Sequence, residues 1–199
     1  MEKLKLIDIS KDLLLSQPKG EDAPAVVKTV ENKESGEKRT ILLTGVHNGT
    51  HLSAPSAFLK QGKSLDSYEP ARFVGECRVV KAKGALTASW IEKMALYRCS
   101  KLLIKGEGKG KIDTTAAEEL VANGVKLIGT DADSIALENM REEVRRILAR
   151  GDCLVLEGLN LEQVSMGTYF LMAQPILMEN CEAAPCRAFL AEDYIYWNR

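Results

Sequence analysis

The stretch "VKLIGTDADSIALENMREEVRRILARGDCLVLEGLN", residues 125–160, reads as a strand, a helix and a second strand in succession. Its ends, 125–131 and 153–160, are short apolar runs, which are typical of strands buried on both faces of a sheet. Residues 134–151 between them predict a helix, with Gly151 as its C-terminal stop. The stretch therefore predicts a strand–helix–strand unit of an α/β protein.

The same alternation extends toward the N-terminus. Thr87 is a plausible N-cap for a helix over 87–99, and Asp113 or Thr114 for a helix that stops at Gly124. Further strands are expected at 4–10, 25–33, 39–46, 77–82, 101–107, 167–178 and 186–197. The strands 25–33 and 39–46 form a hairpin with its turn at 34–38, and Pro175 breaks the strand 167–178. The sequence thus predicts one α/β domain over residues 1–199, with a mixed sheet and flanking helices.

Composition excludes several classes of function. Lys and Arg number 27 and Asp and Glu 28, without a block of like charge, so neither nucleic acid nor an anionic membrane is expected as a partner. The N-terminal residues are not an apolar signal segment, and no run reaches the roughly 20 apolar residues of a membrane span. The five cysteines fit no zinc or redox spacing, and Cys153 and Cys186 look like core residues. We expect a cytoplasmic protein with free thiols.

Both histidines of the chain, His47 and His51, lie in "HNGTHLSAPSAF", residues 47–58. In an extended strand they would be about 13 Å apart on one side, and Gly49 permits a bend that brings them closer. Neutral imidazole is the commonest metal-ligating side chain, so the pair predicts a metal site. The alternative is that both are polar loop residues hydrogen-bonded to backbone.

A stable metal site needs a third ligand, and a carboxylate or thiolate must supply it here. Glu157 is the candidate, because a glutamate at the end of the apolar strand 153–160 is costly to bury without a cation. The alternative is a glutamate that faces solvent or pairs with an arginine.

These residues resemble a known family. "HNGTHLSAP" is similar to the motif His-x-Gly-Thr-His-x-Asp-x-Pro-x-His of the putative cyclase family, which includes bacterial kynurenine formamidase (arylformamidase) and isatin hydrolase. Landmarks along nearly the whole chain agree, among them "LIDIS", "QPKGEDAPA", "VKLIGTDADSI" and "CLVLEGLN". The resemblance implies a swivelling β/β/α fold, a homodimer or homotetramer, and metal-dependent hydrolysis of a linear or cyclic amide at a one- or two-zinc centre. No nucleotide cofactor is implied.

The resemblance also shows departures from the family pattern. The ligating histidines fall on His47 and His51, and the family glutamate falls on Glu157. Three further positions are replaced: the family's metal-bridging aspartate falls on Ser53, its proton-shuttling histidine on Ala57, and a further ligating histidine on Arg145 or, one residue later, Arg146. An arginine beside Glu157 could supply the positive charge that the second metal ion would otherwise supply. We therefore expect the binuclear centre to be lost.

Three interpretations remain open. The chain could be a catalytically degenerate member that binds a small ligand, or a mononuclear hydrolase that uses His47, His51 and Glu157 on zinc or another divalent metal. In the second case Asp131 or Asp133 could act as base, although turn and capping roles are favoured for both. The third interpretation is an oligomer partner, for which the C-terminal aromatics Tyr194, Tyr196 and Trp197 could form an interface. By resemblance, the loop 16–23 borders the pocket; it lacks an aromatic residue, which disfavours an aromatic substrate.

Overall fold

The computed structural model describes residues 5–17, 23–96 and 98–192. Within them, nine strands form one mixed sheet in the order β1-β13-β11-β5-β7-β9-β10-β4-β12. These strands are β1 Leu6–Asp8, β4 His51–Ser53, β5 Val74–Lys81, β7 Lys101–Lys105, β9 Leu127–Thr130, β10 Leu154–Glu157, β11 Gly167–Met172, β12 Ala183–Pro185 and β13 Phe189–Ala191. The predicted α/β class and mixed sheet are confirmed.

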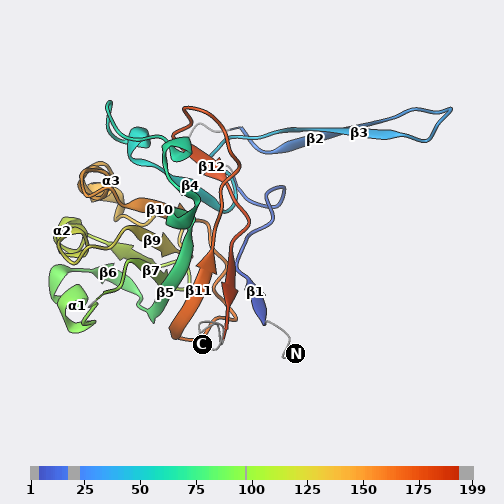
Figure 1. Ribbon diagram of the computed structural model, residues 1–199. Helices are drawn as coiled ribbons and strands as arrows, with labels where there is room; N and C mark the ends of the chain where they lie inside the picture. Colours follow the sequence, from blue (N-terminus) through green and yellow to red (C-terminus); the bar gives the residue numbers. More distant parts are fainter. Residues whose placement is uncertain (1–4, 18–22, 97, 193–199) are drawn as a thin grey trace.

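Three helices cover one face of the parallel strands β5, β7, β9 and β10 (Figure 1). They are α1 Ala88–Lys93, α2 Thr114–Ala122 and α3 Arg141–Arg150, with short 3-10 turns at Pro55–Ala57, Leu65–Ser67, Pro70–Phe73 and Glu138–Met140. Two small strand pairs complete the set of strands in the described ranges: β2 Val26–Glu31 with β3 Lys38–Leu43, and β6 Gly84–Leu86 with β8 Gly110–Ile112.

The sheet separates two apolar clusters because successive side chains of a strand point to opposite faces. Ile128 and Val155 pack toward the helices, in one cluster with Leu120 and Leu148. Their strand neighbours point the other way, into a second cluster that the strands β1, β11 and β13 enclose; it contains Ile9, Leu52, Leu127, Leu154, Leu156, Leu171 and Leu190. Because these strands are buried on both faces, their sequences are continuous runs of apolar residues.

Two helices are shorter than predicted. The helix expected over 134–151 begins only at Arg141, because the backbone of the preceding residues has other partners. Ile135 N–H donates to the Glu157 carboxylate, and Ala136 forms a parallel bridge to Ile112. The helix expected over 87–99 ends at Lys93, and Thr87 occupies its N-cap position without a capping side-chain hydrogen bond.

Other predictions are met or fall outside the described residues. Asp113 caps α2 by accepting the Ala116 N–H at 2.8 Å, as predicted, and β11 ends before Pro175. Cys153 is buried and Cys186 is partly buried against the core. The aromatic residues at 194, 196 and 197 lie outside the part that the structure describes. None of the helices in the described ranges is long and apolar enough to cross a membrane.

The backbone after β10 comes unusually close to the loop that contains the histidines. Gly158 has φ +71°, and a Cβ on it would lie 2.3 Å from the Gly49 carbonyl oxygen. Thr50 reinforces this approach by donating its hydroxyl to the Gly158 carbonyl at 2.6 Å. Only glycine at position 158 therefore allows β10 and the loop to meet.

Replacing Gly158 with alanine should destabilise the fold more than the same change at a glycine with open space around it. Gly124 is the matched control, since it has φ +77° and a Cβ there would meet nothing within 4 Å. Both variants should lose about 1–2 kcal/mol from the left-handed backbone, and Gly158→Ala should lose about 1–3 kcal/mol more from overpacking. Urea unfolding of the two variants measures the difference, and equal losses would contradict the close approach.

Candidate functional site

The pairing of β4 with β10 brings two chemistry-bearing residues together. The strands run antiparallel, with His51 opposite Glu157 and Ser53 opposite Val155. Directly opposed residues share one face of a sheet, here the face that carries α3. Both side chains are buried, and His51 Nε2 lies 3.6 Å from Glu157 Oε2.

The hydrogen bonds of His51 indicate which ring nitrogen carries a proton. Nδ1 lies 3.0 Å from the Gly49 carbonyl oxygen, which can only accept, so Nδ1 is the donor. In the neutral ring Nε2 then has a lone pair, and it has no hydrogen-bond partner among the described residues. A lone pair that faces a carboxylate oxygen is favourable only with a positive charge between or beside them, such as a proton or a metal ion.

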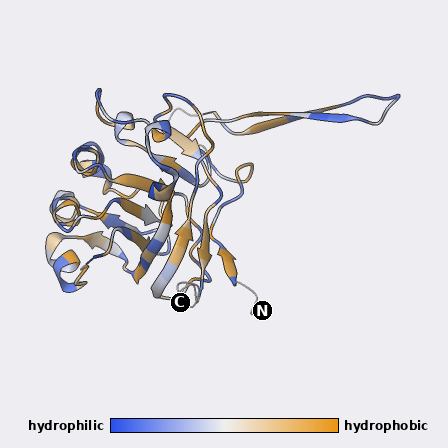
Figure 2. Ribbon diagram, viewed as in Figure 1, coloured by the Kyte–Doolittle hydropathy of each residue, from blue (hydrophilic) through white to orange (hydrophobic). Residues whose placement is uncertain are grey.

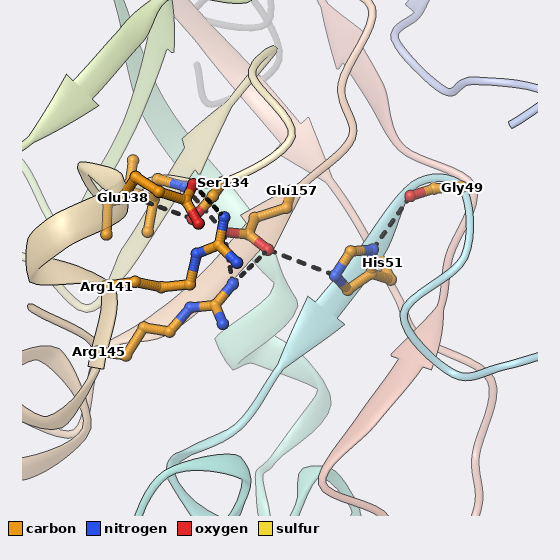
Figure 3. Close-up of polar contacts among 9 residues, drawn as sticks. Gly49, His51, Ser134, Glu138, Arg141, Arg145 and Glu157 are labelled. Atoms are coloured by element: carbon orange, nitrogen blue, oxygen red, sulfur yellow. Dashed lines mark hydrogen bonds and ion pairs between the residues drawn. The ribbon is translucent and has the colours of Figure 1, made fainter. Parts of the chain in front are cut away.

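Glu157 has a cationic partner on its other side. Arg145, from α3, places Nη2 3.3 Å from Oε2 and 3.4 Å from Oε1 of the carboxylate. The Ile135 N–H also donates to Oε1, at 2.8 Å. Figure 3 shows Glu157 between Arg145 and His51. Arg146 instead pairs with Glu142 at 2.6 Å, so Arg145 is the arginine that occupies this position.

The remaining predicted site residues differ in whether they reach the cleft beside His51 and Glu157. The His47 ring packs edge-on against His51, with ring centroids 5.3 Å apart, and lines the cleft described below. Ala57 lines the same cleft, whereas Ser53 is buried within β4. Asp133 is at the cleft, but the Asp131 carboxylate is engaged by three backbone N–H groups, those of Gly106, Glu107 and Gly108. Asp131 therefore has the turn-stabilising role that was favoured for it.

A cleft of about 1020 Å³ opens over these residues. Ser16 and Gln17 border it, as expected for the loop 16–23, of which residues 18–22 lie outside the described part. Sequence reasoning missed two cleft cations, Arg141 and Lys11. Arg141 lies one helical turn before Arg145, so its i, i+4 spacing could have revealed it; nothing in the sequence marked Lys11.

Cysteine does not complete the site. The Cys186 N–H donates to the Thr50 carbonyl at 2.9 Å, so this residue adjoins the histidine loop. Burial raises the pKa of its thiol to about 12. The thiol stays protonated near neutral pH, and a thiolate is the form that ligates a metal or attacks a substrate.

The structure brings two candidate zinc ligands together rather than three. A catalytic zinc takes three protein ligands, and within the described residues no group of three His, Cys, Asp or Glu side chains is arranged to hold a metal. His51 and Glu157 supply two donors, and the permanently charged Arg145 contacts the same carboxylate. The metal-ligand roles of His47, His51 and Glu157 therefore stay predictions.

Solved structures with the same fold are described as hydrolases. The chain superposes on a predicted metal-dependent hydrolase from Bacillus stearothermophilus with a TM-score of 0.82 and 21% identity, covering 96% of this chain and 99% of the other. Isatin hydrolase A from Ralstonia solanacearum gives a TM-score of 0.77 and 17% identity, covering 94% and 92%. At these identities the likeness shows the fold, and it confirms the architecture that the resemblance implied.

Sequence relatives are closer. A kynurenine formamidase of Erythrobacter litoralis is 33% identical over 158 residues, which cover 73% of each chain. A kynurenine formamidase of Geobacillus thermodenitrificans is 31% identical over 184 residues, covering 85% of this chain and 88% of that protein. The family model described as "Putative cyclase" matches residues 7–136. Together these matches show that the chain belongs to the putative cyclase family.

Proposed function

We propose that this chain is a family member that has lost metal-dependent amide hydrolysis and binds a small polar molecule in its cleft. The observation that carries the proposal is the ion pair between Arg145 and Glu157, with Nη2 of the arginine 3.3 Å from the carboxylate. In this proposal the guanidinium provides the positive charge that a metal ion would otherwise provide beside Glu157.

Electrostatics support the replacement of a metal ion by the Arg145 guanidinium. Arginine is always protonated and donates without accepting, so it cannot ligate a metal. Two unit charges about 4 Å apart repel by about 4 kcal/mol at an effective dielectric constant of 20, and a divalent ion would roughly double that. A metal ion bound between His51 and Glu157 would have to overcome this repulsion from Arg145 or displace it.

The proton-transfer position supports the same conclusion. Ala57 lines the cleft where the resemblance expects the shuttling histidine, and an alanine cannot carry a proton. Loss of a general acid or base typically lowers a rate by 10²–10⁴-fold. The cleft retains polar and charged walls, among them Lys11, Ser134 and Arg141, that suit a small molecule with both donors and acceptors.

One distance favours a second candidate, a mononuclear metal hydrolase. Two ligands of a tetrahedral zinc with bonds of about 2.0–2.1 Å are about 3.4 Å apart. His51 Nε2 and Glu157 Oε2 are separated by 3.6 Å, which is close to that spacing. In this case His47 would be the third ligand, and Asp133, at the cleft, could serve as base.

Hydrolysis of N-formylkynurenine separates the two candidates. We expect the purified protein, with or without added zinc, to hydrolyse it at least about 10²-fold more slowly than the Geobacillus relative assayed in parallel, since the shuttle position is alanine. The measurement is the absorbance change on release of kynurenine. A zinc-dependent rate within tenfold of the relative would overturn the proposal.

Removal of the Arg145 charge should create metal affinity. Arg145→Leu removes the cation beside Glu157, so zinc should bind at least tenfold more tightly than to the unmodified chain in titration calorimetry. Arg146→Leu is the matched control, because this neighbouring arginine pairs with Glu142 on the same helix. Equal zinc affinity in the unmodified chain and both variants would show that the Arg145 charge does not exclude a metal ion from Glu157.

A further inference from the structure

A second cavity, of about 510 Å³, adjoins the cleft. Four residues line both spaces: Ala57, Phe58, Arg141 and Arg145. The rest of the lining of the second cavity comes from the start of α3 and the 3-10 turn before it, and consists of Glu138, Asn139, Glu142 and Arg146. Three guanidinium groups therefore border one small cavity, and guanidinium groups are the side chains best suited to bind phosphate and carboxylate.

The stability of α3 does not explain the position of Arg141. This arginine is the first residue of the helix, where the backbone dipole places a partial positive charge and disfavours a cation. Figure 2 shows the hydrophilic colour along much of α3, and Figure 3 shows Arg141 and Arg145 extending from it toward Glu157. A negatively charged group beside Arg141 would interact favourably with both the guanidinium and the helix dipole.

The three arginines keep hydrogen-bond donors that a ligand could use. Each guanidinium has five N–H donors. The glutamates contact only the Nη2 group of each arginine, at 2.6 Å between Glu138 and Arg141, 3.3 Å between Glu157 and Arg145, and 2.6 Å between Glu142 and Arg146. The Arg145 guanidinium also lies over the Phe58 ring, 5.2 Å from its centroid, which fixes its orientation.

Two of the three glutamates can give way to a ligand. The side chains of Glu138 and Glu142 are 75% and 77% exposed. Exposed ion pairs of this kind contribute only about 0–1 kcal/mol to stability. A ligand anion can therefore replace Glu138 beside Arg141 and Glu142 beside Arg146, while the buried Glu157 keeps its contact with Arg145.

We propose that the second cavity binds the phosphate group of a phosphate ester, and that the polar remainder of the ester lies in the cleft. A phosphate group has nearly two negative charges at neutral pH and three acceptor oxygens, so it can use several guanidinium groups at once. A carboxylate has two oxygens, which a single arginine can satisfy. The phosphate site depends only on the second cavity, whereas the placement of the remainder in the cleft rests on the proposed function.

Titration of the ¹⁵N-labelled full chain with methyl phosphate tests the phosphate site. At constant ionic strength the amide signals of residues 138–146 should shift saturably, with an affinity at least about tenfold higher than for acetate, because more charge-assisted hydrogen bonds form. Arg141→Gln and Arg146→Gln should each weaken methyl phosphate binding about tenfold.

Arg150→Gln is the matched control for these variants. Arg150 is an exposed arginine of the same helix, pairs with Glu143 and lines neither cavity, so its loss should leave the affinity unchanged. Methyl phosphate that binds no more tightly than acetate to the unmodified chain would overturn the proposal. An equal loss of affinity in Arg150→Gln would do the same, because it would reveal attraction to the overall charge of the helix.

Glucose 6-phosphate tests the extension of the ligand into the cleft. Its hydroxyl groups should raise the affinity at least about threefold above that of methyl phosphate, and the amide signals of Lys11, Ser134 and Asn160, which line the cleft, should shift as well. Equal affinities, or shifts confined to residues 138–146, would refute the extension. Rapid hydrolysis of N-formylkynurenine would contradict the proposed function while leaving methyl phosphate binding unaffected, so the two failures are distinguishable.

Discussion

The antiparallel pairing of β4 with β10 determines the chemistry of this molecule. It sets the buried His51 opposite the buried Glu157, at the point where the parallel strands of the sheet end. The pairing is possible because Gly158 and Gly49 let two backbone segments touch directly after it. A shift of β4 by one residue would turn His51 to the face opposite Glu157 and move Leu52 out of its core cluster, so the site and the core share one register.

A buried carboxylate must have a positive partner, and the nature of that partner distinguishes possible family members. Here an arginine from α3 contacts Glu157, while Nε2 of His51 lies 3.6 Å from an oxygen of the same carboxylate. The relatives described as metal-dependent hydrolases share the fold, and the kynurenine formamidases share about a third of aligned residues. In the proposed function, this chain keeps the histidine–glutamate pairing, and Arg145 supplies the positive charge that a metal ion would otherwise supply.

Local sequence patterns predicted most of the elements, because alternation and helical spacing are read over a few residues. They placed the start of α3 too early, since the N–H of Ile135 donates to Glu157, a partner 22 residues away that a local pattern cannot reveal. The proximity of His51 to Glu157 was predicted from their chemistry as candidate metal ligands and from the family resemblance, because strands so far apart in the chain have no local signal of pairing. Lys11 was missed for the same reason, and the hairpin was predicted without any sign that it would project from the body.

In the proposed function, Arg145 supplies the positive charge of a metal ion beside Glu157. A crystal grown with zinc and measured on both sides of the zinc absorption edge shows whether a metal binds there. We expect no anomalous peak between His51 and Glu157, with the Arg145 guanidinium in contact with the carboxylate. A peak about 2.0–2.2 Å from His51 Nε2 and a Glu157 oxygen, with Arg145 turned away, would contradict it.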